Sequence, residues 1–71
     1  MYTYHFKVLV AKFIDYKPSS GKYDENKMRE LTDEFETTPS TVIRWIAGKA
    51  NPHESIKKLV IRYIQDKETG G

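Results

Sequence analysis

Apolar residues recur along this 71-residue chain in short clusters with helical spacing, separated by segments rich in proline, glycine and polar residues. The first cluster follows the i, i+3, i+4, i+7 spacing of one apolar helix face and predicts a helix over residues 3–16: Phe6, Leu9, Val10, Phe13 and Ile14. The alternation of apolar residues at positions 4, 6, 8 and 10 would instead suit a strand. Helix is the favoured interpretation, and strand is the alternative.

The segment at residues 18–21, Pro-Ser-Ser-Gly, ends the first helix, because proline cannot continue a helix and Ser-Gly favours a turn. Its Ser-Gly-Lys sequence is also found in phosphate-binding loops. Such a loop needs a glycine five places before the Gly-Lys pair and a Ser or Thr after it, and these places hold Tyr16 and Tyr23. We therefore interpret the segment as a spacer.

Two further helices follow at close distance. Asp24 is a suitable N-cap for a helix over residues 25–35, whose inward residues are expected to be Met28, Leu31 and Phe35. Thr38 and Pro39 form the next start signal, a capping hydroxyl followed by proline at the first helical position. This third helix is predicted over residues 39–47, with Val42, Trp45 and Ile46 inward and Gly48 at its end.

A last helix is predicted over residues 52–66. Asn51 would cap it, Pro52 would take its first position and Glu54 its third. Its apolar positions again follow helical spacing: Ile56, Leu59, Val60, Tyr63 and Ile64. Residues 67–71 are expected to be a frayed tail. With no internal repeat, residues 1–71 are predicted to form a single all-α domain.

Composition and charge exclude several classes of protein. The chain has no cysteine, and its two histidines have no metal-type cluster beside them, so we expect neither a metal nor another cofactor. No general base, nucleophile or glycine cradle accompanies the acidic residues, and an enzyme is not expected. The longest uncharged apolar run covers only residues 8–11, and the N-terminus lacks a signal-peptide pattern. We therefore expect a cytoplasmic protein without a membrane partner.

The net charge of +2 is unevenly distributed. Residues 24–36 carry six acids against two basic residues, which gives this segment a charge of −4 and the rest of the chain +6. An anionic partner would therefore prefer the rest of the chain.

The spacing within residues 31–49, LTDEFETTPSTVIRWIAGK, is more specific than the helices alone. It resembles the helix-turn-helix of the phage repressor and Cro-like family, also called the XRE family, at five offsets: Leu31, Val42, Trp45, Gly48 and Lys49. The resemblance covers residues 28–64, about half of the chain. It implies a small four-helix bundle of the lambda-repressor-like type, in which Leu31 and Phe35 pack against Val42 and Trp45 to fix the angle between two helices.

Three positions depart from the family pattern. Thr32 stands where alanine is usual and is small enough to be tolerated. Glu36 stands where glycine is usual, at a turn position that often has positive φ, so strain of about 1 kcal/mol is expected. Met28 replaces the glutamine that touches a phosphate in the family, which puts that contact in doubt.

The resemblance implies that the start of the third helix faces base edges in the major groove, with four candidate base contacts: Thr38, Pro39, Ser40 and Arg44. The guanidinium of Arg44 can bond both acceptors of a guanine, whereas its alternative is a solvated helix arginine. Thr38 is expected to cap the helix rather than to contact bases, and Pro39 offers only an apolar contact to a thymine methyl.

Two more residues are candidates for the DNA backbone. The Thr41 hydroxyl either reaches a phosphate or bonds back to the helix. Lys49 lies where the family meets the backbone, and its alternative is a lysine favoured by the helix dipole. Ile43 is expected to point away from the face of Val42 and Trp45, as a contact to DNA, a contact to protein or an isolated surface residue.

Two functions remain open at this point. The resemblance implies a sequence-specific DNA-binding transcription regulator of the phage or prokaryotic repressor type, bound as a homodimer to an inverted repeat in double-stranded DNA. The alternative is a phage modulator or antirepressor that uses the same fold to bind a repressor protein. The acidic segment at residues 24–36 motivates this alternative, because acids near phosphate oppose DNA binding.

Overall fold

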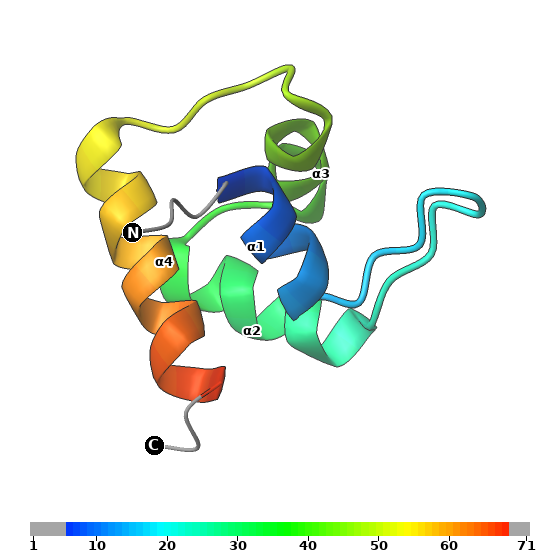
Figure 1. The fold of residues 1–71 in the computed structure, drawn as a ribbon, viewed down its shortest axis with the longest axis horizontal. Coiled ribbons are helices and arrows are strands. Elements are labelled where there is room, and N and C mark those ends of the chain that lie inside the picture. The colour runs from blue at the N-terminus through cyan, green and yellow to red at the C-terminus, as the bar shows by residue number, and fades with distance from the viewer. Residues whose placement is uncertain (1–5, 69–71) are drawn as a thin grey trace, which may run out of the picture.

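The computed structural model describes residues 6–68, which form four helices and no strand (Figure 1). The helices are α1 (Phe6–Phe13), α2 (Glu25–Phe35), α3 (Pro39–Ala47) and α4 (Glu54–Glu68). The predicted all-α class is confirmed, and residues 6–10, the described part of the alternative strand, lie in α1. Within the described residues, no helix is both long and apolar enough to cross a membrane.

Helices α2 and α3 begin and end where the sequence predicts, because side chains cap their N-terminal ends and residues in the left-handed conformation end them. The Asp24 carboxylate accepts from the backbone N–H of Lys27. The Thr38 hydroxyl accepts in the same way from the N–H of Thr41. Gly48 ends α3 with a φ of 77°, a conformation that costs glycine little.

The outer bounds of α1 and α4 differ from the prediction. Helix α1 ends at Phe13 rather than at residue 16, because Asp15 takes a left-handed φ of 54° and the Tyr16 N–H bonds back to the Ala11 carbonyl at 2.9 Å. The predicted residues 3–5 of this helix lie outside the described residues.

Helix α4 begins two residues later and continues further than predicted. Its start is held by His53 rather than Asn51, since the His53 Nδ1 accepts from the Ser55 N–H at 3.3 Å. The helix continues through Lys67 and Glu68, so the predicted frayed tail is wrong for these two residues. Residues 69–71 of that tail lie outside the described residues.

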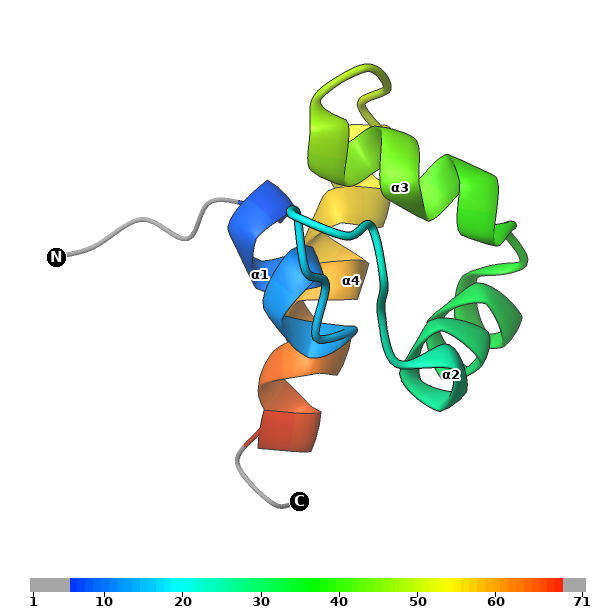
Figure 2. The ribbon, with the colours of Figure 1, turned by 90° about the vertical axis from the view of Figure 1, so that its right-hand side faces the viewer.

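The core lies around α1, which packs against both α3 and α4, while α2 packs against α3 (Figures 1 and 2). Each helix contributes to one cluster of buried apolar side chains: Phe6, Leu9, Val10, Phe13, Ile14, Met28, Leu31, Val42, Trp45, Val60 and Ile64. Two of the apolar positions predicted to face inward on α4 do not, since Ile56 is 36% and Leu59 52% exposed. Val60 and Ile64, which belong to the same predicted set, are fully buried.

Candidate nucleic-acid interface

A connection of three residues, 36–38, fixes how α3 leaves α2. Glu36 takes a left-handed conformation with φ 50° and ψ 48°, as the family resemblance predicts for this position. Its backbone N–H and that of Thr37 both bond to the Thr32 carbonyl, the latter at 3.0 Å. The turn is therefore held by backbone bonds, although its first residue, Glu36, carries a side chain in a region that favours glycine.

The first turn of α3 is turned to solvent. Thr38, Pro39 and Ser40 are exposed, and Thr41 is half-buried. The two threonine hydroxyls lie 3.0 Å apart and bond to each other, so Thr41 bonds back within the helix. Among the residues that the structure describes, the Ser40 hydroxyl makes no such bond and stays available to a ligand.

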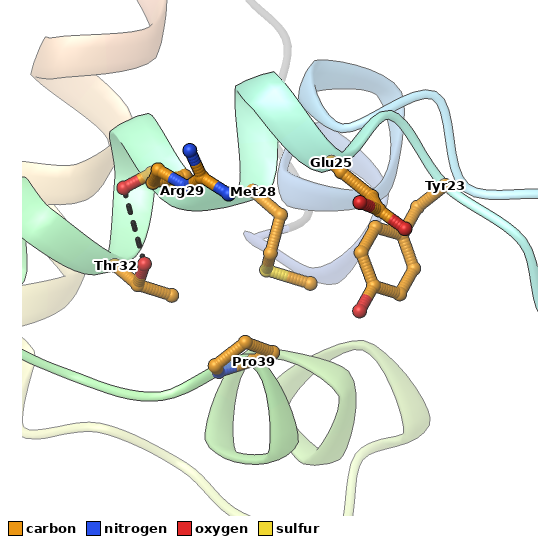
Figure 3. A pocket seen from close by; sticks show the side chains of 6 residues that line it. All are labelled: Tyr23, Glu25, Met28, Arg29, Thr32 and Pro39. Carbon is orange, nitrogen blue, oxygen red and sulfur yellow. Dashed lines mark hydrogen bonds between the residues drawn. The ribbon is translucent and has the colours of Figure 1, made fainter.

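An open hollow of about 190 Å³ separates the start of α3 from the start of α2 (Figure 3). The Pro39 ring borders it from α3, and Met28, Glu25 and Tyr23 border it from the other side. Met28 is only 2% exposed, so it packs into the core and offers no polar group to a phosphate. The Glu25 carboxylate beside this hollow would repel a phosphate, whereas the exposed Arg29, which also lines it, would attract one.

Basic side chains lie toward the other end of α3. Arg44 and Lys49 are exposed, and neither makes an ion pair or side-chain hydrogen bond to any part of residues 6–68. Lys7 of α1 lies close by, since a methyl group placed on Gly48 would be 3.4 Å from the Lys7 Nζ. Sequence spacing could not find Lys7, because only the packing of α1 on α3 brings it to this place.

The packing beneath α3 differs in part from the expected contact between α2 and α3. Leu31 and Val42 are fully buried, as predicted. The Trp45 ring, however, lies against Phe6 of α1, with centroids 5.5 Å apart, and Phe35 meets Tyr63 of α4 edge-on at 5.7 Å. Neighbouring helices therefore supply the aromatic partners that the prediction sought within α2 and α3 alone.

Ile43 does not point away from the core as predicted. It is half-buried and packs against the core cluster, whereas Ser40 and Arg44 of the same helix are exposed. Ile43 is therefore not an isolated surface residue.

A polar link ties α2 to α4 behind this surface. The Tyr63 hydroxyl donates to the Glu30 Oε2 at 2.7 Å, and the Lys67 ammonium bonds the same oxygen at 2.8 Å. The Lys67 bond, followed by the Tyr63 bond, lowers the pKa of Glu30. Burial and the Glu30 carboxylate together raise the pKa of Tyr63 to about 12, and the Glu30 bond raises the pKa of Lys67.

The described residues contain no group of histidine, cysteine and acidic side chains that could hold a metal ion. Comparison of the chain with models of protein families, with curated proteins and with solved structures returns no match. The proposals below therefore rest on the residues and their geometry.

Proposed function

We propose that this protein is a sequence-specific DNA-binding transcription regulator of the phage or prokaryotic repressor type, in which α2 and α3 act as a helix-turn-helix. One observation carries the proposal. The first turn of α3 is exposed and held by its cap and by the turn at Glu36, while Arg44, one turn further on, has no partner among the described residues. A rigid helix with free donors is what a major groove accepts.

The dimensions and chemistry of α3 suit that role. An α-helix with its side chains is about 10–12 Å across, and the major groove is about 12 Å wide. Arg44 would bond the two acceptors of a guanine, and Ser40 would bond a base or a phosphate. Pro39 would make an apolar contact, although it also borders the hollow against Met28.

The backbone of the duplex would be held by other groups. Lys49 would bind a phosphate next to the end of α3, and Lys7 would add a second cation beside Gly48. Thr38 and Thr41 would stabilise the start of α3 through their mutual bond and contribute less to DNA contact. A homodimer would place two such helices on an inverted repeat with half-sites about one helical turn apart.

Selection of duplex DNA from a random pool at moderate salt tests this proposal, followed by titration of the selected sequence. Arg44→Ala should weaken binding about five- to 150-fold, the value of one bidentate contact, and should relax preference at one base position. Arg62→Ala is the matched control, since Arg62 is an exposed arginine on α4. Absence of any enriched sequence, or equal losses in both variants, would contradict the proposal.

One observation favours a second candidate, a modulator that binds a repressor protein through the same fold. Glu25 places a carboxylate on the hollow beside Pro39, where a phosphate of a bound duplex would lie, although Arg29 lines the same hollow. For such a modulator the selection would enrich no sequence. If the modulator binds its repressor through other surfaces, Arg44→Ala would leave its affinity for the purified repressor unchanged.

A further inference from the structure

The loop between α1 and α2 has a regular structure that its role as a spacer does not explain. Residues 16–23, Tyr-Lys-Pro-Ser-Ser-Gly-Lys-Tyr, fold back on themselves so that Lys17 and Lys22 form an antiparallel bridge. The Lys17 N–H bonds the Lys22 carbonyl at 2.8 Å. The loop thus has the form of a short hairpin rather than an irregular crossing.

Backbone hydrogen bonds fix the end of this hairpin. The Lys17 carbonyl accepts from the Ser20 N–H at 3.2 Å and from the Gly21 N–H at 2.7 Å. Gly21 takes a φ of 73°, which a residue with a side chain would adopt only with strain. The hairpin is therefore organised before any ligand binds, so binding would require little free energy to order it.

The bridge places two lysines opposite each other on this hairpin. Successive residues of an extended strand alternate between its two faces, and directly opposed residues share a face. Tyr16 and Tyr23, the neighbours of the bridged pair, are half-buried and pack against the core cluster. Lys17 and Lys22 are exposed. The tyrosines thus anchor the hairpin while both ammonium groups face solvent.

The charges on this hairpin are incompletely balanced. Opposed like charges destabilise a strand pair. The Asp15 carboxylate lies 3.2 Å from the Lys17 Nζ, in an ion pair that is open to solvent. Lys22 makes no ion pair with any other residue of the described range. An anion bound beside the two lysines would relieve this repulsion, and phosphate is the anion that a duplex supplies.

The hairpin lies next to the surface that would meet DNA. It projects on the side of α1 opposite to α4, where the chain enters α2 (Figures 1 and 2). Its last residue, Tyr23, lines the hollow that Pro39 borders from the first turn of α3 (Figure 3). The hairpin and the exposed start of α3 are therefore neighbouring parts of one surface.

We propose that this hairpin is a second DNA contact, in which Lys17 and Lys22 bind phosphates of the strand flanking the groove that α3 enters. The proposal rests on the proposed function and extends it from one helix to a two-part surface. The hairpin supplies affinity without sequence preference, because it presents ammonium groups to the backbone and nothing to base edges. Lys22 also lies close to Glu25, so its ammonium group offsets part of the negative charge there.

The test compares the intact protein with the double variant Lys17→Ala/Lys22→Ala, using the selected duplex and an unrelated duplex over a range of salt concentrations. Loss of two phosphate contacts should reduce the slope of log affinity against log salt by about 2. Affinity for both duplexes should fall on the order of tenfold, with base preference unchanged. The charge-preserving variant Lys17→Arg/Lys22→Arg should keep the original slope.

Lys58→Ala/Arg62→Ala is the matched control, because it removes two exposed cations from α4, on the opposite side of α1. Circular dichroism would check that each variant keeps its helices. An unchanged slope in the hairpin variant, or an equal loss in the control, overturns the hairpin contact while leaving the role of α3 intact. If the intact protein binds both duplexes equally and the hairpin variant still loses slope, the hairpin contact is supported and sequence-specific regulation is overturned. Absence of any binding by the intact protein overturns both.

Discussion

Glu36 is the residue at which the turn between α2 and α3 carries the most local strain. Its φ of 50° and ψ of 48° lie in the left-handed region, where a side chain costs about 1 kcal/mol relative to glycine. Its carboxylate also lies at the C-terminal end of α2, where the helix dipole disfavours a negative charge. Both effects act against stability, and the backbone bonds to Thr32 hold the residue in place.

We therefore expect Glu36→Gly to raise the free energy of unfolding by about 1 kcal/mol, measured by urea denaturation. Glu34→Gly is the control, because Glu34 lies within α2 and glycine there should lower stability by a similar amount. A decrease in stability for Glu36→Gly would show that the greater freedom of glycine in the unfolded chain outweighs the strain.

Residues whose role depends on neighbours in sequence could be predicted, and those that depend on distant contacts could not. The caps at Asp24 and Thr38 follow from local patterns, and the left-handed position at Glu36 was expected from the family resemblance. The cap at His53 replaces the expected one because a ring nitrogen reaches the Ser55 N–H, which no residue preference indicates. Lys7 reaches Gly48 only through the packing of α1 on α3.

At the scale of helices, the link between α2 and α4 depends on one carboxylate with two donors. Tyr63 and Lys67 both bond the Glu30 Oε2, and the Tyr63 ring also lies between Phe13 and Phe35. The sequence placed Tyr63 on the apolar face of its helix but gave no sign of Glu30, which is 33 residues away. The bounds of α2 and α3 were predictable for the opposite reason, because caps specify them locally.

Tyr63→Phe tests this link while it keeps the aromatic packing. Loss of one hydrogen bond to a partly buried carboxylate should lower the free energy of unfolding by about 1 kcal/mol near pH 7. A variant as stable as the original protein would show that Lys67 alone satisfies Glu30. Glu30→Ala, alone and combined with Tyr63→Phe, would complete a double-mutant cycle that isolates the pair.

The same link makes stability depend on pH in two ranges. Tyr63 has its pKa raised to about 12 in the folded protein, so it contributes stability that is complete below pH 10 and is lost as the pH rises toward 12. Glu30 has its pKa lowered, so its contribution is present above its ordinary value and is lost as the pH falls through the folded value. Unfolding measured from pH 9 to 12 should show a loss in the original protein that Tyr63→Phe reduces.

At the scale of the whole molecule, opposite charges are placed next to each other on the surface proposed to meet DNA. Residues 24–36 carry a charge of −4, and one of these acids, Glu25, borders the hollow between α2 and α3. Arg29 lines the same hollow and Lys22 lies beside Glu25, while Lys17 of the hairpin and Arg44 of α3 add positive charge elsewhere on this surface. A duplex held by these cations would bring its phosphates near one carboxylate, which lowers affinity without removing it.

Removing that carboxylate should therefore change DNA affinity and stability in opposite directions. We expect Glu25→Gln to increase affinity about threefold to fivefold at low salt, the effect of relieving one like-charge contact of roughly 0.7–1 kcal/mol in near-bulk water. The same change should lower the free energy of unfolding by about 0.3–1 kcal/mol, because Glu25 is an acid in the first turn of α2. Duplex titration and urea denaturation measure the two effects.

Glu34→Gln is the control for this change. The charge of Glu34 contributes to the raised pKa values of Tyr63 and Lys67, so this residue lies toward α4. It should leave DNA affinity within twofold of the original. An equal gain from both variants would mean that the duplex senses only net charge and that the hollow at Glu25 is not close to it. A protein that modulates a repressor would have no duplex affinity to raise, so a selective gain from Glu25→Gln favours direct DNA binding by this surface.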